Sequence, residues 1–240
     1  MRRVVASTVL ALFLVCLIAT PVLAGSPTKT QNTLVMTWTK VTNTSDTAGI
    51  ITSGEFDCSA AYSSALHIYA GLAGTTAHDG IEVIVQVASI ATTNDSWTEL
   101  TRFLMASGTA FKSDFATDEA IGQTVLSVTN PATGNLDHDG KNVFIYPADD
   151  ANIANCEIAY QVDNSGDAGD TITVLDPITA ACTVDTDVYT CDTATASAVS
   201  EVVVQLPMSA SRARVIFNNA YDASGSTVIV RIRATKVTAL

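Results

Sequence analysis

Several signatures of particular chemistry are missing from this sequence. It has no C-x-x-C pair, which removes the usual ligand spacing of a four-cysteine zinc site. The G-x-S-x-G motif is also missing, and with it the strand-to-helix elbow of the common serine hydrolases. No segment sustains an apolar period of 3.6 residues, so helices are not expected. These absences leave a strand-rich chain without a catalytic signature, and we expect a non-enzymatic protein.

Basic residues are scarce: 12 Lys and Arg stand against 24 Asp and Glu, for a formal net charge of −12. Such a chain repels phosphate and releases no counterions, so nucleic acid and anionic membrane surfaces are not expected partners. The charge is unevenly distributed. Residues 25–195 hold 5 basic and 22 acidic residues, whereas residues 196–240 hold 5 basic and 2 acidic residues. The two regions should attract each other, within one molecule or between copies.

The first 24 residues are typical of a cleavable signal peptide. Arg2 and Arg3 precede an apolar stretch at residues 4–18, and Val22 and Ala24 are small residues two positions apart. The alternative is a membrane anchor, because residues 4–23 approach the roughly 20 residues that span a bilayer. Cleavage predicts a secreted or cell-surface protein that starts at about Gly25 and makes no membrane contact afterwards. Losing the two arginines changes the formal charge from −12 to about −14.

Cysteine usage agrees with export. Once Cys16 leaves with the signal, an even number of cysteines remains, in a compartment where disulfides persist. Four cysteines allow three pairings. We favour Cys182 with Cys191, because the short stretch between them suits a hairpin whose closure contributes about 2–3 kcal/mol. Cys58 is then left to pair with Cys156.

The remainder reads as β-strands, which predicts an all-β fold. Residues 34–41 and 81–87 alternate apolar and polar side chains, placing Leu34, Met36 and Trp38 on one face of the first strand. Three further strands are predicted at residues 202–206, 214–217 and 227–233. The turn-rich stretch 218–225 predicts a hairpin between the last two.

Composition changes along the chain suggest a nested arrangement. Short predicted strands at residues 123–128, 142–146, 156–162 and 171–175 are separated by acidic, glycine-containing turns. We therefore expect a β-sandwich built from residues 25–115 plus 196–240, with an inserted small β-barrel-like module at residues 116–195. A single continuous sandwich is the alternative.

A family resemblance rests on strand-and-turn patterns spread over most of the mature chain. The segments concerned are residues 52–68, 95–103, 121–125, 143–146, 170–175, 212–215 and 225–228. In these segments the chain resembles uncharacterised β-rich proteins encoded by environmental bacteriophages. The resemblance implies a structural or surface-binding role, in a particle or fibre, and supplies no catalytic residues.

The acidic stretch at residues 163–170 is the main candidate metal site. Asp163, Asp167 and Asp170 could supply oxygen ligands to calcium, although the stretch does not match the EF-hand pattern. A solvated hairpin loop is the alternative. A weaker second group consists of Asp137, Asp139, Asp149 and Asp150. No other cofactor is expected.

The three histidines have structural explanations. His78 and His138 each precede Asp-Gly, which predicts exposed turns, and His67 lies in an apolar strand.

Two arginine pairs near the C-terminus suggest assembly. Arg212 and Arg214 are two apart, as are Arg231 and Arg233, so each pair projects from one side of its strand. They could form a positive strip that meets the acidic face of a neighbouring copy. Alternatively, they are a charged solvent face that protects the sheet from edge pairing.

These observations predict a secreted, non-enzymatic structural or surface protein that self-assembles into a fibre, layer or particle. One alternative is an extracellular carbohydrate-binding or adhesive domain that recognises a surface glycan. That alternative needs a platform of exposed aromatic side chains, drawn from Trp97, Tyr62, Tyr69 and Tyr160. A phage virion-associated structural protein is another alternative. A glycan hydrolase would need two carboxylates facing each other across a groove.

Overall fold

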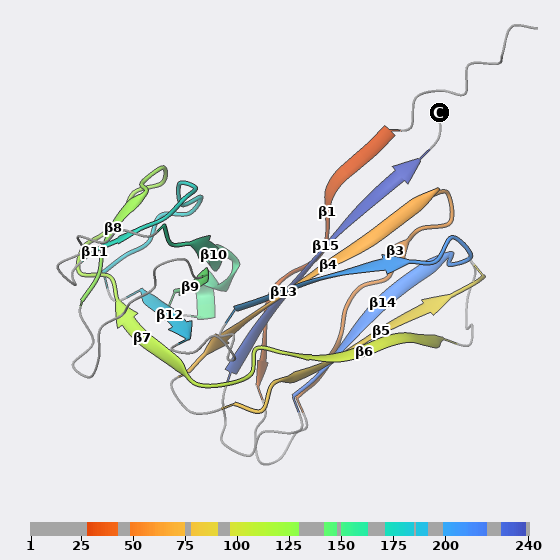
Figure 1. Ribbon diagram of the computed structural model, residues 1–240, viewed down its shortest axis with the longest axis horizontal. Helices are drawn as coiled ribbons and strands as arrows, with labels where there is room; N and C mark the ends of the chain where they lie inside the picture. Colours follow the sequence, from red (N-terminus) through yellow and green to blue (C-terminus); the bar gives the residue numbers. More distant parts are fainter. Residues whose placement is uncertain are drawn as a thin grey trace, which may run out of the picture.

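The protein is antiparallel and all-β, as the sequence predicts. The computed structural model describes residues 28–42, 49–74, 78–90, 97–129, 142–147, 150–162, 171–184, 186–191, 199–219 and 227–238. Within these ranges the only helical element is one 3-10 segment, η1 (Asp150–Asn155). No helix in the described ranges has the length and hydropathy to cross a membrane. The predicted signal peptide, residues 1–24, lies outside the described residues. Figure 1 shows two lobes.

The larger lobe has the two sheets of a β-sandwich. Across the first sheet the order is β1 (Thr28–Thr42), β15 (Thr227–Thr238), β4 (Ser63–Ala73) and β13 (Val199–Leu206). Across the second it is β2 (Ile50–Thr52), β14 (Arg212–Asn218), β5 (Ile81–Ala88) and β6 (Thr98–Met105), with β3 (Phe56–Asp57) also on β14. Both ends of the chain therefore contribute strands to both sheets.

Period-two burial builds the core between these sheets. In β5 the side chains of Ile81, Val83 and Val85 are fully buried, whereas Ile84 and Gln86 between them are only partly buried. In the facing sheet, strand β4 contributes the buried side chain of Ile68 to the same core. Each such aliphatic side chain stabilises the fold by about 1.5–3 kcal/mol.

The predicted alternation of β1 is only partly right. Trp38 is 2% exposed, but Leu34, expected on the same face, is 56% exposed. The β1–β15 pairing has register shifts between Leu34 and Met36 and between Met36 and Thr39. Irregularities of this kind add a residue to one strand and reverse the facing of those beyond it.

The predicted hairpin between the last two strands is wrong. β14 pairs with β5, β2 and β3, whereas β15 pairs with β1 and β4 in the opposite sheet. The link after Asn219 therefore carries the chain between sheets. Turn residues specify a change of direction, but they do not specify which sheet the next strand joins.

The smaller lobe contains two short sheets. One has the order β10 (Glu157–Tyr160), β9 (Asn142–Tyr146), β12 (Asp187–Cys191) and β7 (Ala110–Asp114). The other pairs β11 (Thr171–Thr173) with β8 (Val125–Ser127). β7 precedes residue 116, so this sheet includes a strand that the sequence assigned to the sandwich.

A second core fills this lobe. Single bridges between Phe115 and Val128 and between Gln161 and Val174 place β8 beside β7 and β11 beside β10. The six strands thus surround the apolar side chains in a ring, without forming a continuously hydrogen-bonded barrel among the described residues. Fully or nearly fully buried members of this core include Phe115, Leu126, Ile145, Ile172 and Val188.

An aromatic side chain of the smaller lobe packs against the larger lobe. Phe144 of β9 is fully buried and, with Tyr146, Cys156 and Tyr189 of the same lobe, belongs to the apolar cluster that continues into the larger lobe. Its ring centroid lies 5.5 Å from that of Trp38 on β1, and the ring covers Gly71 on β4. This contact places the smaller lobe on the outer face of the first sheet, directly beside a groove.

Candidate functional site

Strand register aligns a row of polar side chains on the outer face of the first sheet. Tyr69 of β4 lies opposite Arg231 of β15 on one side and Glu201 of β13 on the other. Alternate residues of a strand share a face, so Tyr69 projects from the same face of β4 as Gly71. The polar row therefore lies next to the position where Phe144 covers Gly71. The next row pairs Arg233 with His67. The polar rows thus lie on the outer face of the first sheet, directly beside the smaller lobe.

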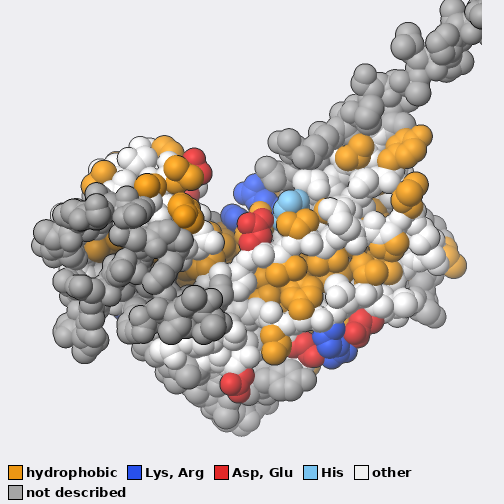
Figure 2. Space-filling view, in the orientation of Figure 1, with side chains coloured by type: hydrophobic (Ala, Val, Ile, Leu, Met, Phe, Trp, Pro, Cys, Tyr) orange, Lys and Arg blue, Asp and Glu red, His pale blue; other side chains and the backbone are white. Residues whose placement is uncertain are grey.

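A groove with a volume of about 300 Å³ lies at this boundary, and we call it the junction groove. Its walls come from both lobes: Tyr69, Arg231 and Arg233 from the larger, and Cys156, Glu157, Ile158 and Thr179 from the smaller. Figure 2 shows basic, acidic and histidine side chains gathered in the notch between the lobes.

Arg231 is held by aromatic rings. Its guanidinium carbon lies 4.4 Å from the ring centroid of Trp38 and 4.8 Å from that of Tyr69. Burial, and then the neighbouring Arg233 guanidinium, lower the pKa of Arg231. The Nε atoms of both arginines are buried without a hydrogen-bond partner. In the described parts of the chain no carboxylate lies within ion-pair distance of either arginine.

The carboxylates around the groove already have partners. Glu157 accepts hydrogen bonds from the backbone N–H of Thr179 at 2.9 and 3.2 Å. Glu201 lies 3.7 Å from His67 Nδ1, and its charge adds to burial in raising the pKa of Tyr69. Neither carboxylate forms an ion pair with the arginines, although the charge of Glu157 acts on Arg231 from a longer distance, so two adjacent positive groups face the groove.

Cys156 contributes a thiol to the wall of this groove, but this thiol is a poor nucleophile. Burial raises the pKa of the Cys156 thiol to about 12, so the thiolate that would attack a substrate is scarce at neutral pH. The residues around the groove therefore suit binding better than covalent chemistry.

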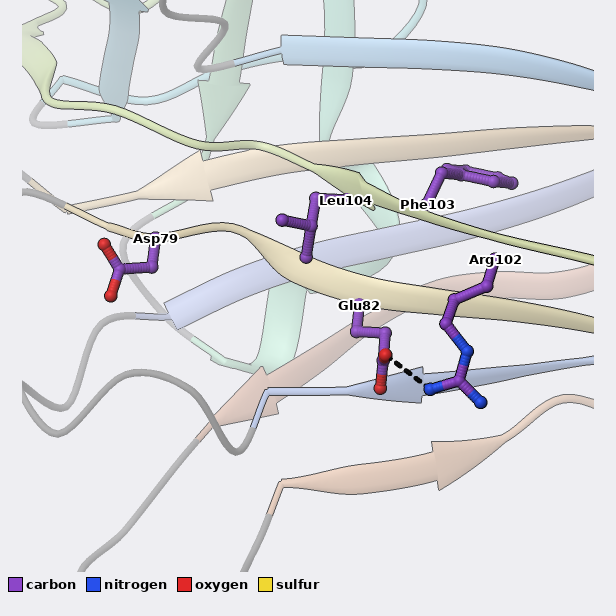
Figure 3. Close-up of a pocket in the computed structure, with 5 residues that line it drawn as sticks. All are labelled: Asp79, Glu82, Arg102, Phe103 and Leu104. Atoms are coloured by element: carbon purple, nitrogen blue, oxygen red, sulfur yellow. Dashed lines mark hydrogen bonds and ion pairs between the residues drawn. The ribbon is translucent and has the colours of Figure 1, made fainter.

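A second pocket, of about 430 Å³, opens at strand β6 and is lined by Asp79, Glu82, Arg102, Phe103 and Leu104. Figure 3 shows Glu82 and Arg102 pointing toward each other, with Asp79 directed away from the pair. The Arg102 Nη1 to Glu82 Oε1 distance is 2.6 Å, and Asn218 donates to the other Glu82 oxygen at 3.0 Å. The buried carboxylate is thus satisfied internally, which indicates a structural role.

The arginines predicted to form an assembly strip lie on two different sheets. Arg212 and Arg214 project from β14, with their guanidinium carbons 5.2 and 4.2 Å from the Trp97 ring centroid. Arg212 also pairs with Glu55 at 2.5 Å, and Arg214 donates to Gln86 at 2.8 Å. Arg231 and Arg233 belong to β15 and the junction groove. The structure therefore does not bring the four together.

The aromatic residues proposed as a glycan platform are also dispersed. Trp97 lies against the β14 arginines and Tyr69 lines the junction groove. Tyr62, 59% exposed, lies just before β4, and Tyr160, 45% exposed, lies on β10 in the other lobe.

The expected disulfides are not formed among the cysteines with described side chains. Cys58, Cys156 and Cys182 are all free and buried. The Cys58 thiol donates to the carbonyl of Ala210 at 3.3 Å, whereas Cys156 lines the junction groove, so the structure does not join the predicted Cys58–Cys156 pair. Cys182 is not joined to Cys191, whose side chain lies outside the description.

The calcium candidates Asp163, Asp167 and Asp170 lie outside the described residues, as do His138, Asp137, Asp139 and Asp149. The side chain of Asp150 is likewise not described. Among the residues that are described, no group of three or more His, Cys, Asp or Glu side chains is arranged to hold a metal ion.

The exposed turn predicted at His78 is wrong. His78 is 3% exposed, because its backbone bridges Gly108 through hydrogen bonds of 2.8 and 2.7 Å, and its Nδ1 accepts from Gly80 N. Gly80 adopts a φ of +101°, a left-handed conformation that suits glycine.

Sequence reasoning missed the groove itself. Tyr69, Glu157 and Thr179 come from three separate segments, and no local pattern links them. The spacing of Arg231 and Arg233 was the one available signal. The chain matches no protein-family model, and no curated protein matches it either.

Proposed function

We propose that this chain is an exported, non-enzymatic structural protein that self-assembles through an open edge of its sandwich. The observation that carries the proposal is strand β13. It ends the first sheet and, among the described strands, pairs on one side only, with β4. An edge strand presents unpaired N–H and C=O groups, which are a template for another strand.

β13 lacks the features that usually protect an edge. Its eight residues pair with β4 without a register break, and Glu201 is its one charged side chain. The second sheet ends in strand β6. This edge strand has a register irregularity in its pairing with β5 and carries the charged residues Glu99 and Arg102. Bulges and charges of this kind discourage edge pairing. The geometry therefore favours β13 as the contact strand.

The expected partner is a second copy of this chain, because the outward face of β13 is self-complementary. Glu201, Val203 and Gln205 alternate as exposed residues along the strand. An antiparallel pair of β13 strands centred on Val203 sets Val203 against Val203 of the second copy. Glu201 then faces Gln205 of the second copy, whose amide can donate to the carboxylate.

The surrounding surface supports this register. Figure 2 shows a band of hydrophobic side chains across the larger lobe, over the region where Figure 1 places β13. Val203 is 47% exposed, and Val202 is partly buried against the core. Pairing would cover part of this band and extend the first sheet across two molecules. The predicted signal peptide supports export, and the resemblance to phage β-rich proteins supports a structural role.

Light scattering coupled to size-exclusion chromatography tests the proposal on the chain from Gly25 onward. The wild type is expected to form dimers or larger species whose proportion rises with concentration. Val203→Lys should yield monomers, because two lysines would face each other across the symmetry axis. Val184→Lys is the matched control, since Val184 is 48% exposed but lies in the smaller lobe.

A wild-type chain that remains monomeric at high concentration would overturn the proposal. Equal assembly of the wild type and Val203→Lys would overturn the assignment to β13. Circular dichroism of both variants verifies that each retains its strand content.

A further inference from the structure

The junction groove has a property that the proposed assembly does not use: it holds two neighbouring guanidinium groups with no carboxylate paired to them. Arg231 is fixed by Trp38 and Tyr69, at 4.4 and 4.8 Å from the ring centroids. Arg233 lies two residues further along β15, so it projects from the same face of the strand. We propose that the groove is a binding site for the carboxylate group of a small organic ligand.

The electrostatics of the arginine pair favour an anion, although the charge of Glu157 offsets part of the positive charge. Each of the two positive groups disfavours the other, and the pKa of Arg231 is lowered by burial and by Arg233. Partly buried charges without an ion-pair partner carry a desolvation cost, and arginine is the side chain that binds planar oxyanions through paired N–H donors. An anion between the two guanidinium groups would relieve both the repulsion and the desolvation.

The nearby acids select the type of anion. Glu157 lines the groove and Glu201 stands beside Tyr69, although both already have other partners. Their negative charges oppose a doubly charged phosphate or sulfate more strongly than a singly charged carboxylate. A planar carboxylate also matches the fork geometry of a guanidinium.

The size of the groove limits the ligand. Its volume of about 300 Å³ is at the lower end for small-molecule sites, so it suits a group of about monosaccharide size. Thr179 and Tyr69 add hydroxyl groups to the walls, and Ile158 adds an apolar surface. The ligand class is therefore a compact hydroxylated carboxylic acid, of which a uronic acid is a suitable representative.

Isothermal titration calorimetry with glucuronate tests this assignment on the chain from Gly25 onward. Glucose is the neutral ligand of similar shape, and sulfate and phosphate are the competing anions. Glucuronate should bind measurably, glucose should not, and sulfate and phosphate should bind more weakly than glucuronate. Arg233→Gln should weaken glucuronate binding by about tenfold, the loss of one charge-assisted hydrogen bond.

Lys236→Gln is the control, because it removes one positive charge from the same strand at a position whose ammonium instead contacts the carbonyl of Asp57. This variant should bind glucuronate within about twofold of the wild type, an effect of long-range charge alone. Equal binding of glucuronate and glucose, preference for phosphate or sulfate, or unchanged binding in Arg233→Gln would each overturn the proposal. Val203→Lys, which targets assembly, adds a positive charge in the row of His67 and Arg233 and should therefore not weaken glucuronate binding, so the two proposals fail separately.

Discussion

A β-carbon added to Gly71 would lie 2.6 Å from the ring of Phe144, closer than two non-bonded carbon atoms approach. The glycine on β4 thus provides the space into which the phenylalanine of the smaller lobe packs. Phe144 is fully buried there, against Trp38 at 5.5 Å between ring centroids. This contact holds the smaller lobe against the first sheet, and the walls of the junction groove depend on it.

Substitutions at this contact should be coupled. Gly71→Ala should lower the free energy of unfolding by about 1–3 kcal/mol through overpacking, and Phe144→Ala by about 3–5 kcal/mol through a cavity. In the double variant the new methyl group occupies space that the ring has vacated, so the loss should be smaller than the sum of the two. Denaturant unfolding of all four proteins measures the coupling.

Phe115→Ala is a useful comparison, because Phe115 is equally buried but belongs to the core of the smaller lobe. Its effect should simply add to that of Gly71→Ala. Additive losses for Gly71 and Phe144 would show that the two residues are not in contact.

The sandwich strands illustrate how far sequence patterns reach. Alternation in β5 correctly predicts its inward residues, because a half-buried regular strand has a strict period of two. The same reasoning fails in β1, where register shifts intervene, and Leu34 becomes exposed while Trp38 is buried. Such irregularities depend on the partner strand, β15, which the local sequence of β1 does not reveal.

The groove was harder to predict because it is a product of long-range pairing. The positions of Tyr69 and Arg231 are set by the β4–β15 register, and Thr179 lines the groove from the smaller lobe. The paired arginines were recognised from their spacing, but spacing gives no information about which surface faces them. His78 was misjudged for a similar reason, since its burial depends on a backbone bridge to Gly108, far along the chain.

The free cysteines should resist modification in the native protein. Burial raises the pKa of Cys156 to about 12 and that of Cys182 to about 11, and it also raises the pKa of Cys58. At pH 8 the thiolate fraction would then be roughly one in 10,000 for Cys156 and one in 1,000 for Cys182. Alkylation with iodoacetamide should leave these three cysteines unmodified in the folded state.

A second alkylating reagent of different mass, added in guanidinium chloride without reductant, should then label all three. Peptide mass spectrometry distinguishes the two labels. Rapid native labelling would contradict the burial, and a cysteine that reacts in denaturant only after reduction would show a disulfide, contrary to the free thiols of the structure.

The same shifts predict a loss of stability in alkali. The folded protein keeps the Cys156 proton up to about pH 12, whereas the unfolded chain loses it near the ordinary value of 9.0. The unfolded state therefore binds fewer protons above pH 9, and the free energy of unfolding falls as the pH rises from there toward 12. At pH 10 this amounts to about 1 kcal/mol for Cys156, with a similar contribution from Cys182.

Urea unfolding between pH 8 and 10 measures this slope. Cys156→Ala removes the titrating thiol, so its stability should decline less steeply with pH than that of the wild type, whatever its stability at pH 8. Ile158→Val, a small loss of volume two residues away on strand β10 and without a titrating group, should keep the wild-type slope. If Cys156→Ala and the wild type show parallel pH dependence, the thiol does not titrate differently in the folded and unfolded states, and it is not buried as the structure has it.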